Sequence, residues 1–129
     1  MITVTLNDVR NSGEALRKLA QQPMSARTAY KIARLSKAIE AEYAIFSEGQ
    51  RGLIEKYAER DENGEFVRLD ENSIKIKVDC VEKCNAELFE LLNTEVEINA
   101  EKLRLEELDN ISISPSELNM LMPFIADED

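Results

Sequence analysis

The residues with the most distinctive chemistry in this sequence are two cysteines. Cys80 and Cys84 lie four residues apart in a segment with a helical pattern, which places both thiols on neighbouring turns of one face. Structural zinc usually needs four Cys or His ligands, and thiol redox motifs prefer two intervening residues. The sequence has no histidine and no second cysteine pair. We interpret the two cysteines as inert, reduced core thiols, which fits a cytosolic compartment.

A calcium-binding loop is the second candidate site. Asp61, Asn63 and Glu65 occupy positions one, three and five of such a loop. The sixth position should be glycine but is Phe66, and the twelfth should be a bidentate glutamate but is Asn72. The segment therefore predicts a turn with solvated carboxylates, and we expect no metal site.

Acid–base catalysis has few candidate residues. Histidine, the commonest general base, is absent. Glu87 and Glu90 lie at helical spacing, but on a polar helix face rather than in a cleft. No P-loop, glycine-rich phosphate turn or nucleophile motif occurs. We expect a protein that is not an enzyme and that uses no cofactor.

A basic ridge is the clearest charged feature of the first half. Arg27, Lys31 and Arg34 stand at i, i+4 and i+7 of a predicted helix. Such a ridge could meet phosphates, but no aromatic residue interleaves it and the net charge is −10, so we do not expect direct nucleic-acid binding. We predict a solvated face, or one paired with acidic residues. The candidate interaction surface combines this ridge with carboxylates of two predicted turns: Asp61, Glu62, Glu65, Asp70 and Glu71.

Charge is distributed unevenly along the chain. Residues 1–60 have a net charge of +3, whereas residues 61–129 have a net charge of −13. Two alternatives follow: the halves attract each other within the fold, or they present faces of opposite sign to partners. Nucleic-acid mimicry belongs to the second alternative. Cations that lie among the acids make that surface mixed, and they include Lys75, Lys77, Lys83, Lys102 and Arg104.

Length and composition bound the class of protein. The 129 residues, 43% of them hydrophobic, fit one domain with a real core. No apolar run approaches the roughly 18 residues that span a bilayer. The first residues show neither a basic start nor an apolar signal region. We therefore expect a soluble, intracellular protein without a membrane partner.

The strongest structural signal is a long amphipathic helix at 26–60. At 1.5 Å per residue it would be roughly 50 Å long, and Gly49 and Gly52 inside it predict a bend or a place where another backbone packs closely. A helix of this length needs an antiparallel partner in the chain, for which we expect 79–93, or a second subunit. Its apolar positions recur every three, four or seven residues: Ile32, Leu35, Ile39, Tyr43, Phe46, Leu53 and Tyr57.

The remaining elements complete an α+β fold. Capping oxygens are predicted from Asn7 and Asp8, from Ser114, and from a capping box between Asp79 and Glu82. We expect a long antiparallel helical hairpin with a small sheet, a projecting β-hairpin and short terminal helices. The acidic end at 127–129 is expected to be solvated. The predicted ranges are strand 2–6, helix 8–22, hairpin 65–78, helix 79–93, strands 95–98 and 102–106, and helix 115–122.

Several segments resemble a group of small acidic proteins encoded by tailed bacteriophages and prophages. They are the Glu-Lys-Tyr at 55–57, the Asp-Glu-Asn-Gly turn at 61–64, and the stretches at 86–98, 114–118 and 123–125. Members of that group have no established function. The resemblance therefore implies a viral origin and a bacterial host cytoplasm, and carries over no site residue. The glycine that often follows Lys-Tyr in the group is Ala58 here, which predicts a slightly longer helix.

Two functions follow from these expectations. The first is a non-enzymatic phage accessory protein that acts through protein contacts, either in virion assembly or on a host factor. It predicts an exposed apolar patch or a homodimer through the long helix. The alternative is an acidic, nucleic-acid-mimicking inhibitor of a host nuclease or defence complex, motivated by the charge of −13 in the second half.

Overall fold

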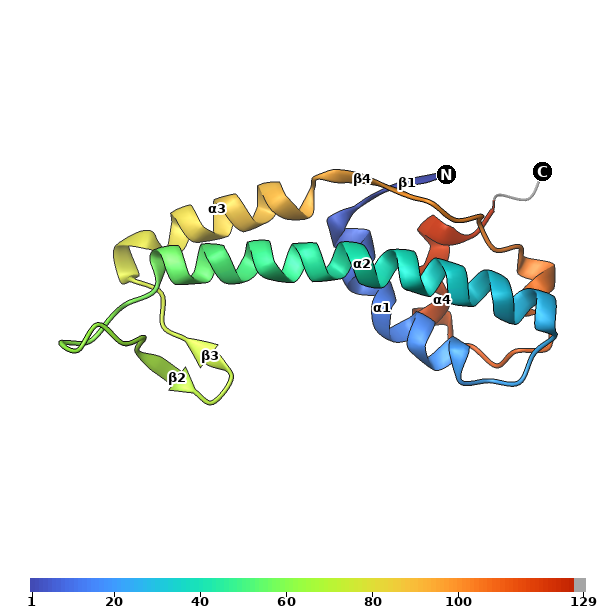
Figure 1. Cartoon of the computed structure of the whole chain (residues 1–129), viewed down its shortest axis with the longest axis horizontal. Helices are drawn as coiled ribbons and strands as arrows, with labels where there is room; N and C mark the ends of the chain where they lie inside the picture. The colour runs from blue at the N-terminus through green and yellow to red at the C-terminus, as the bar shows by residue number, and fades with distance from the viewer. Residues whose placement is uncertain (127–129) are drawn as a thin grey trace. The chain divides into compact units, whose positions relative to one another are not determined.

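The computed structural model describes residues 1–126, and the acidic end predicted to be solvated, 127–129, lies outside the described residues. The fold is α+β, as predicted. The chain divides into two compact units that share the helix α2: unit 1 contains residues 1–44 and 94 onward, and unit 2 contains residues 45–93. In chain order the elements are β1 (Ile2–Thr5), α1 (Leu6–Ala20), α2 (Ala26–Tyr57), β2 (Arg68–Asp70), β3 (Ser73–Ile74), α3 (Val81–Leu92), β4 (Glu95–Ile98) and α4 (Pro115–Leu121) (Figure 1).

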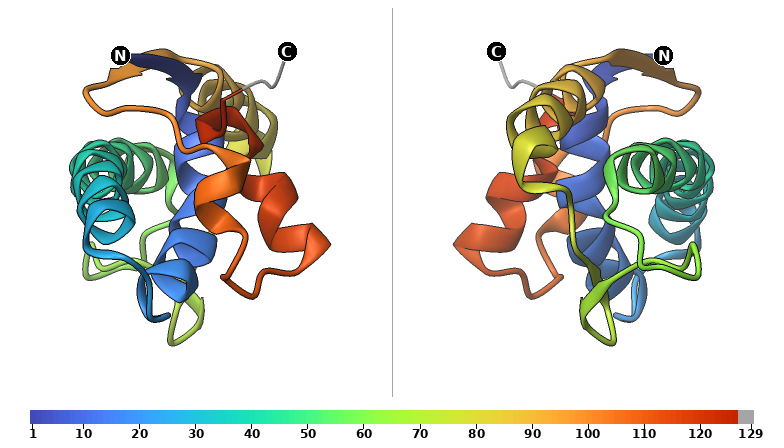
Figure 2. Two further views of the ribbon diagram at one scale, coloured as in Figure 1. Left: turned by 90° about the vertical axis from the view of Figure 1, so that its right-hand side faces the viewer. Right: turned by 90° about the vertical axis from the view of Figure 1, so that its left-hand side faces the viewer.

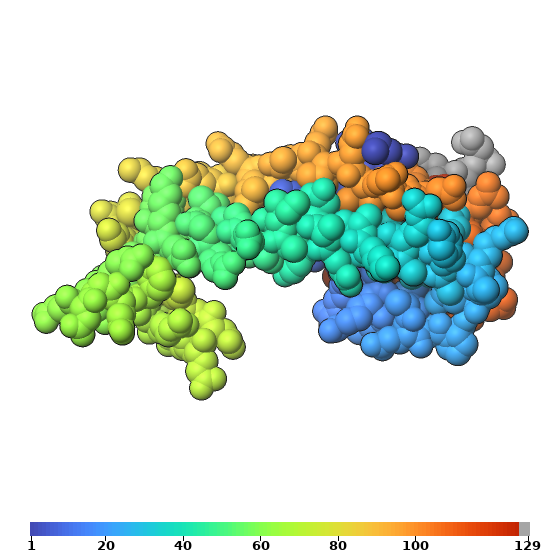
Figure 3. Space-filling model, viewed as in Figure 1, coloured from blue at the N-terminus to red at the C-terminus, as the bar shows by residue number. Residues whose placement is uncertain are grey.

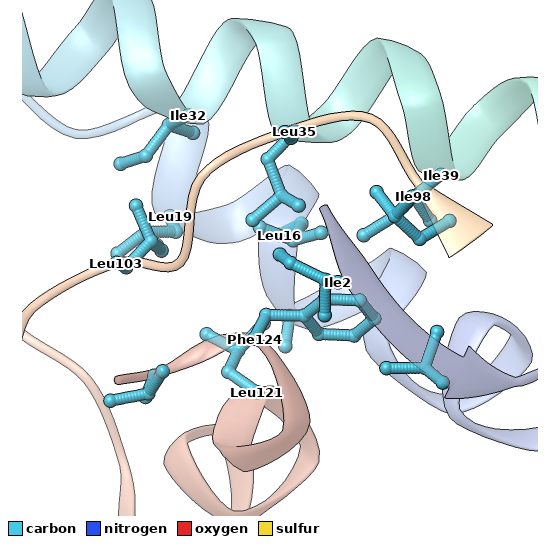
Figure 4. Packing of buried hydrophobic residues seen from close by; sticks show 14 of the residues in the cluster. Ile2, Leu16, Leu19, Ile32, Leu35, Ile39, Ile98, Leu103, Leu121 and Phe124 are labelled. Carbon is cyan, nitrogen blue, oxygen red and sulfur yellow. The ribbon is translucent and has the colours of Figure 1, made fainter. Parts of the chain in front are cut away.

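Unit 1 is built around α1. In Figure 2, α1 lies between the first part of α2 and α4. Strands β1 and β4 pair antiparallel, with Ile2 opposite Ile98 and Val4 opposite Val96. Apolar residues at helical spacing on α1 and α2 meet those of the sheet and the C-terminal segment, because each element has one apolar face to bury. Figure 4 shows this core: Ile2, Leu16, Leu19, Ile32, Leu35, Ile39, Ile98, Leu103, Leu121 and Phe124.

The start of α1 differs from the prediction in its cap. The helix begins at Leu6 rather than residue 8, and Thr5 is its N-cap instead of Asn7 or Asp8. The Thr5 Oγ1 accepts a hydrogen bond from the Asp8 N–H at 3.2 Å, and the Asp8 carboxylate accepts one from the Thr5 N–H at 3.1 Å. This reciprocal capping box satisfies two backbone donors at once, which explains why the helix starts directly after β1.

The predicted strand at 102–106 is wrong. Leu103 makes only a single parallel bridge, to Ile125, and Leu105–Leu108 form a 3-10 helix. The Glu107 carboxylate accepts a hydrogen bond from the Arg104 N–H at 2.9 Å, which caps that helical turn. The alternation of Leu103 and Leu105 suggested a strand, but it is Leu103 and Leu108 that are buried.

The C-terminal helix confirms its predicted cap. Ser114 Oγ accepts a hydrogen bond from the Glu117 N–H at 3.1 Å, and Pro115 occupies the first turn of α4. α4 ends at Leu121, one residue before the predicted end, and a 3-10 turn follows at Met122–Phe124. That turn buries Phe124 completely in the core of unit 1.

Unit 2 contains the predicted antiparallel helical hairpin. The Lys56 Nζ lies 3.3 Å from the Glu87 carboxylate. Gly49, about two turns earlier in α2, faces Leu91, about one turn later in α3. As the residue number decreases along α2, the residue number of the contact in α3 increases, so the two helices run antiparallel. A Cβ added at Gly49 would lie 3.3 Å from a Leu91 methyl carbon, so the neighbour at this glycine is a side chain of α3 rather than the predicted backbone, and a Cβ at Gly52 meets nothing within 4 Å.

The helix α2 ends at Tyr57, not at residue 60. Ala58 is buried and forms an antiparallel bridge with Ile76. The Lys77 N–H donates to the Tyr57 carbonyl at 2.9 Å, so the backbone after Tyr57 pairs with an extended segment instead of continuing the helix. The longer helix predicted from Ala58 is therefore wrong.

The projecting β-hairpin has shorter strands than the predicted 65–78 range, and its strands β2 and β3 pair antiparallel with a register shift between Arg68 and Asp70. The segment after α2 joins them through a ring of backbone hydrogen bonds: Glu59 donates to Lys75, Lys75 to Val67, and Val67 to Glu59, at 2.8–2.9 Å. These bonds fix the hairpin to the end of α2, and Figure 3 shows how this segment projects there.

The predicted capping box at the start of α3 does not form. A 3-10 turn at Val78–Cys80 precedes α3, and neither Asp79 nor Glu82 provides a side-chain cap. Lys77 donates its N–H to Tyr57 and accepts the first bond of the 3-10 turn from Cys80 at 2.8 Å, so strand pairing sets the entry to the helix.

We predict opposite effects for two glycine-to-alanine substitutions. Gly13 lies inside α1, and a Cβ there meets nothing within 4 Å, so Gly13→Ala should stabilise the protein by up to about 1 kcal/mol. Gly64 has φ +79°, so Gly64→Ala should destabilise it by about 1–2 kcal/mol. Urea unfolding followed by circular dichroism measures both values. A loss of stability in Gly13→Ala would contradict the geometry of α1.

Candidate interaction surface

The eight predicted surface residues are divided between the two units. The basic ridge of Arg27, Lys31 and Arg34 belongs to unit 1, at the start of α2, and the acidic residues 61–71 belong to unit 2. The two sets are therefore described separately.

Lys31, at the centre of the ridge, is engaged within unit 1. Its Nζ lies 2.8 Å from the Glu107 carboxylate and 3.9 Å from Glu101. The side chains of Lys31 and Glu107 are only 19% and 16% exposed. Burial raises the pKa of Glu107, but hydrogen bonds from Lys31 and the Arg104 backbone outweigh it, so the pKa lies below the ordinary 4.5. Lys31 therefore serves as the internal partner of a carboxylate.

Arg27 and Arg34 flank Lys31 and are both exposed. Arg27 lines an open groove together with Tyr30 and Arg104, and Glu101, Glu106 and Glu107 line the same groove. Cations and carboxylates thus alternate over this part of unit 1. The ridge predicted from the sequence becomes a surface of mixed charge.

The charge asymmetry between the two halves of the sequence does not give the two units different net charges. Residues 1–44 carry seven basic and four acidic side chains, and residues 94–129 carry two basic and ten acidic ones. Both stretches belong to unit 1, whose net charge is −5, and unit 2 has the same value from seven basic and twelve acidic residues. Ion pairs from Lys31 to Glu107 and from Lys18 to Glu117 join the two stretches. These pairs favour the first alternative, attraction within the fold.

The acidic turn residues have two different roles. Asp61 Oδ1 accepts hydrogen bonds from the backbone N–H groups of Asn63 and Glu65 at 2.9 and 3.0 Å, and Asp70 Oδ1 accepts one from Asn72 at 2.8 Å. These two aspartates stabilise the turns themselves. The exposed carboxylates without such a role are Glu62, Glu65 and Glu71. Within residues 1–126, no three acidic or cysteine side chains gather as metal ligands would.

The sequence analysis missed the most exposed apolar surface of unit 2. Val78 is 82% exposed, Val81 41% and Phe89 67%. Asn85 and the half-buried Leu92 complete one stripe with them along α3 and the turn before it. We call these five residues the α3 flank.

The opposite side of α3 packs against α2. Cys84 is buried there, and this burial raises the pKa of its thiol, as expected for an inert core cysteine, whereas Cys80 is half-buried. A hydrogen bond from the Tyr57 hydroxyl lowers the pKa of Glu87, burial opposes this shift, and Lys56 reinforces it. The same hydrogen bond raises the pKa of Tyr57. One side of α3 is thus fixed to α2, and the α3 flank stays uncovered.

A wide apolar arc on α3 was the available sequence signal. The predicted stripe placed Val81 with Cys84, which is buried, and Leu91, which is half-buried, although at about 100° per residue these positions span roughly 80° on one side of Val81. Val78 and Phe89 extend the arc further on the other side. An arc this wide exceeds what one neighbouring helix can cover.

No family model, no curated protein and no solved structure matches this chain. Among residues 1–126, none of the helices combines the length and the apolar character needed to cross a bilayer. The function is therefore argued from the surface described above.

We predict that the Lys31–Glu107 pair stabilises unit 1 in a pH-dependent way. The pKa of Glu107 in the folded state lies below the ordinary value. The stabilisation is therefore present at neutral pH and is lost as the pH falls below about 4.5. Glu107→Gln should lower the free energy of unfolding at pH 7 by about 1–2 kcal/mol. The matched control is Glu48→Gln, which removes an exposed ion pair with Arg51. It should change the free energy of unfolding by less than about 0.5 kcal/mol.

Urea unfolding at pH 7 and at pH 3.5 tests this pair. The difference between wild type and Glu107→Gln should shrink in acid, because protonation of the Glu107 carboxylate removes its charge and its attraction to Lys31. An equal difference at both pH values would contradict a role for the charge.

We predict that Tyr57 ionises at a higher pH than an ordinary tyrosine. Its pKa is raised above 10.0 by the hydrogen bond to Glu87 and by burial. Absorbance titration at alkaline pH should show a late component that Tyr57→Phe removes and that Glu87→Gln shifts to lower pH. Glu82→Gln, on the exposed side of α3, is the control and should leave the titration unchanged. If Glu87→Gln had no effect, the hydrogen bond would not exist in solution.

Proposed function

We propose that this chain is a non-enzymatic accessory protein of a bacteriophage or prophage, which acts through protein–protein contacts in virion assembly or on a host factor in the bacterial cytoplasm. The observation that carries the proposal is the α3 flank. Phe89 on α3 and Val78 in the 3-10 turn before it are large apolar side chains that are more than half exposed. Exposed apolar residues that gather in one place mark interaction sites, whereas scattered ones need no explanation.

The physical reason is the cost of hydrating apolar surface. Burial of such surface is worth about 25 cal/mol per Å², and the fold already uses this gain for Cys84 and Leu91 on the other side of α3. The most exposed side chains of the α3 flank, Val78 and Phe89, gain little of this free energy within the fold. A protein partner that covers Val81 and Phe89 would gain this free energy on binding. Phage origin rests on the sequence resemblance alone.

Nucleic-acid mimicry is the second candidate, motivated by the acidic turns of unit 2. Glu62, Glu65 and Glu71 are exposed and are not used by the turns. In unit 1, however, Glu107 and Glu117 pair with lysines, which leaves fewer carboxylates for a basic groove. The observations therefore support apolar contact more than mimicry.

Capture from a bacterial host lysate at two salt concentrations should separate these functions. Wild-type chain fixed to a resin should retain partners at about 0.5 M NaCl, because apolar contact is not screened, whereas mimicry predicts their loss. Val81→Glu/Phe89→Glu should abolish retention by placing charge in the contact, since Val81 is 41% and Phe89 67% exposed. The matched control, Glu62→Gln/Glu65→Gln/Glu71→Gln, should retain the partners. The reverse pattern between the two variants would contradict the proposal.

A further inference from the structure

The α3 flank has a symmetric arrangement about Asn85. Val81 and Phe89 lie four residues before and after it, and Val78 and Leu92 lie seven residues before and after it. At 3.6 residues per turn, Val81, Phe89 and Leu92 fall within about 40° of Asn85 around the axis of α3, and Val78 lies in the 3-10 turn that precedes this helix. We propose that a second copy of this chain covers the α3 flank, with the two α3 helices antiparallel and crossing at Asn85. This rests on the proposed function and names the partner.

Two-fold symmetry favours this arrangement. A twofold axis through Asn85 places each residue of one copy opposite the residue equally far on the other side of Asn85 in the second copy. Phe89 then faces Val81 of the second copy, and Leu92 faces its Val78. Each large side chain meets a smaller one, which packs without voids. A parallel arrangement would instead oppose Phe89 to Phe89 and Val81 to Val81.

Asn85 has the chemistry that the axis requires. Its side chain is exposed and makes no hydrogen bond within residues 1–126. An amide carries both a donor and an acceptor, so two Asn85 side chains on a twofold axis can satisfy each other. A single asparagine in an apolar helix seam is known to fix the register of helix pairing. In the proposed dimer Asn85 selects the register in which Val81 meets Phe89.

The distribution of charge is compatible with self-pairing. None of the five residues of the α3 flank is charged, although 33% of the chain is. The nearest charge at the border is Glu82, and the antiparallel arrangement places it beside Phe89 of the second copy rather than beside a second Glu82. Glu87 is held on the other side by Lys56. Like charges therefore do not oppose each other across the seam.

The size of the seam predicts a reversible dimer. α3 has 12 residues, so a pair of these helices buries less than the roughly 1,200–2,000 Å² of a standard stable interface. The dimer should therefore form and dissociate with concentration. Because the contact is apolar, it should persist at about 0.5 M NaCl.

Sedimentation equilibrium over a range of concentrations tests self-pairing. The wild-type chain should show a monomer–dimer equilibrium at both low and high salt. Phe89→Glu and Asn85→Asp should each weaken association by at least about tenfold, by placing charge in the seam or on the axis. The matched control is Leu69→Glu, because Leu69 is 69% exposed in β2, outside the flank. It should associate as wild type does.

Disulfide trapping tests the geometry. Chains carrying Val81→Cys and Phe89→Cys, distinguished by mass, are mixed and oxidised, and the wild-type chain corrects for Cys80 and Cys84. The mixed disulfide should form faster than either homodimeric one. Faster homodimeric disulfides would show parallel pairing and overturn the proposal.

The outcomes separate this inference from the proposed function. A chain that stays monomeric at every concentration, yet captures another protein through Val81 and Phe89, would overturn self-pairing and leave the contact function standing. A monomeric chain that captures nothing through these residues would overturn both. Association that is equally weakened by Leu69→Glu and Phe89→Glu would also overturn self-pairing, because the seam would then not be α3.

Discussion

The structure depends on how the apolar face of α2 is buried along its 32 residues. In unit 1 this face meets α1 and the C-terminal segment, so that Ile32, Leu35 and Ile39 are almost fully buried. In unit 2 the same helix is covered by α3, which buries Phe46 and Cys84. However, α3 has a second side, and on this side the α3 flank stays partly exposed, with Val78 at 82% and Phe89 at 67%. The constraint that forms the helical hairpin therefore also leaves the contact surface exposed.

Electrostatics act mainly within the fold of unit 1. The basic N-terminal stretch and the acidic C-terminal stretch lie in one unit, where Lys31 meets Glu107 in a mostly buried pair. Such a pair is retained because each partner compensates the other's loss of hydration. The carboxylates that remain exposed at the turns of unit 2, such as Glu62 and Glu71, keep the net charge negative and the surface hydrated. Apolar contact is therefore the better-supported route to a partner.

The sequence predicted the elements that local rules control. Helical periodicity located α2 and α3, and Ser114 and Asp61 formed the predicted cap and turn. The failures have tertiary causes: Ala58 leaves the helix to pair with Ile76, and the 102–106 segment follows the cap made by Glu107 instead of its alternating pattern. For the candidate interaction surface, the pattern of charged residues in the sequence predicted the basic ridge and the acidic turns. The α3 flank was missed because periodicity shows an apolar face but not which neighbour covers it.

The account makes one central claim, that the α3 flank is a contact surface used by a second copy of the chain. A concentration series of amide and methyl NMR spectra tests it most directly, because each signal reports its own surroundings. The account predicts shifts that grow with concentration at Val78, Val81, Asn85 and Phe89, while signals of the unit 1 core such as Leu103 stay constant. Signals from α3 that do not move at any concentration, or shifts confined to the β2–β3 turn, would contradict it.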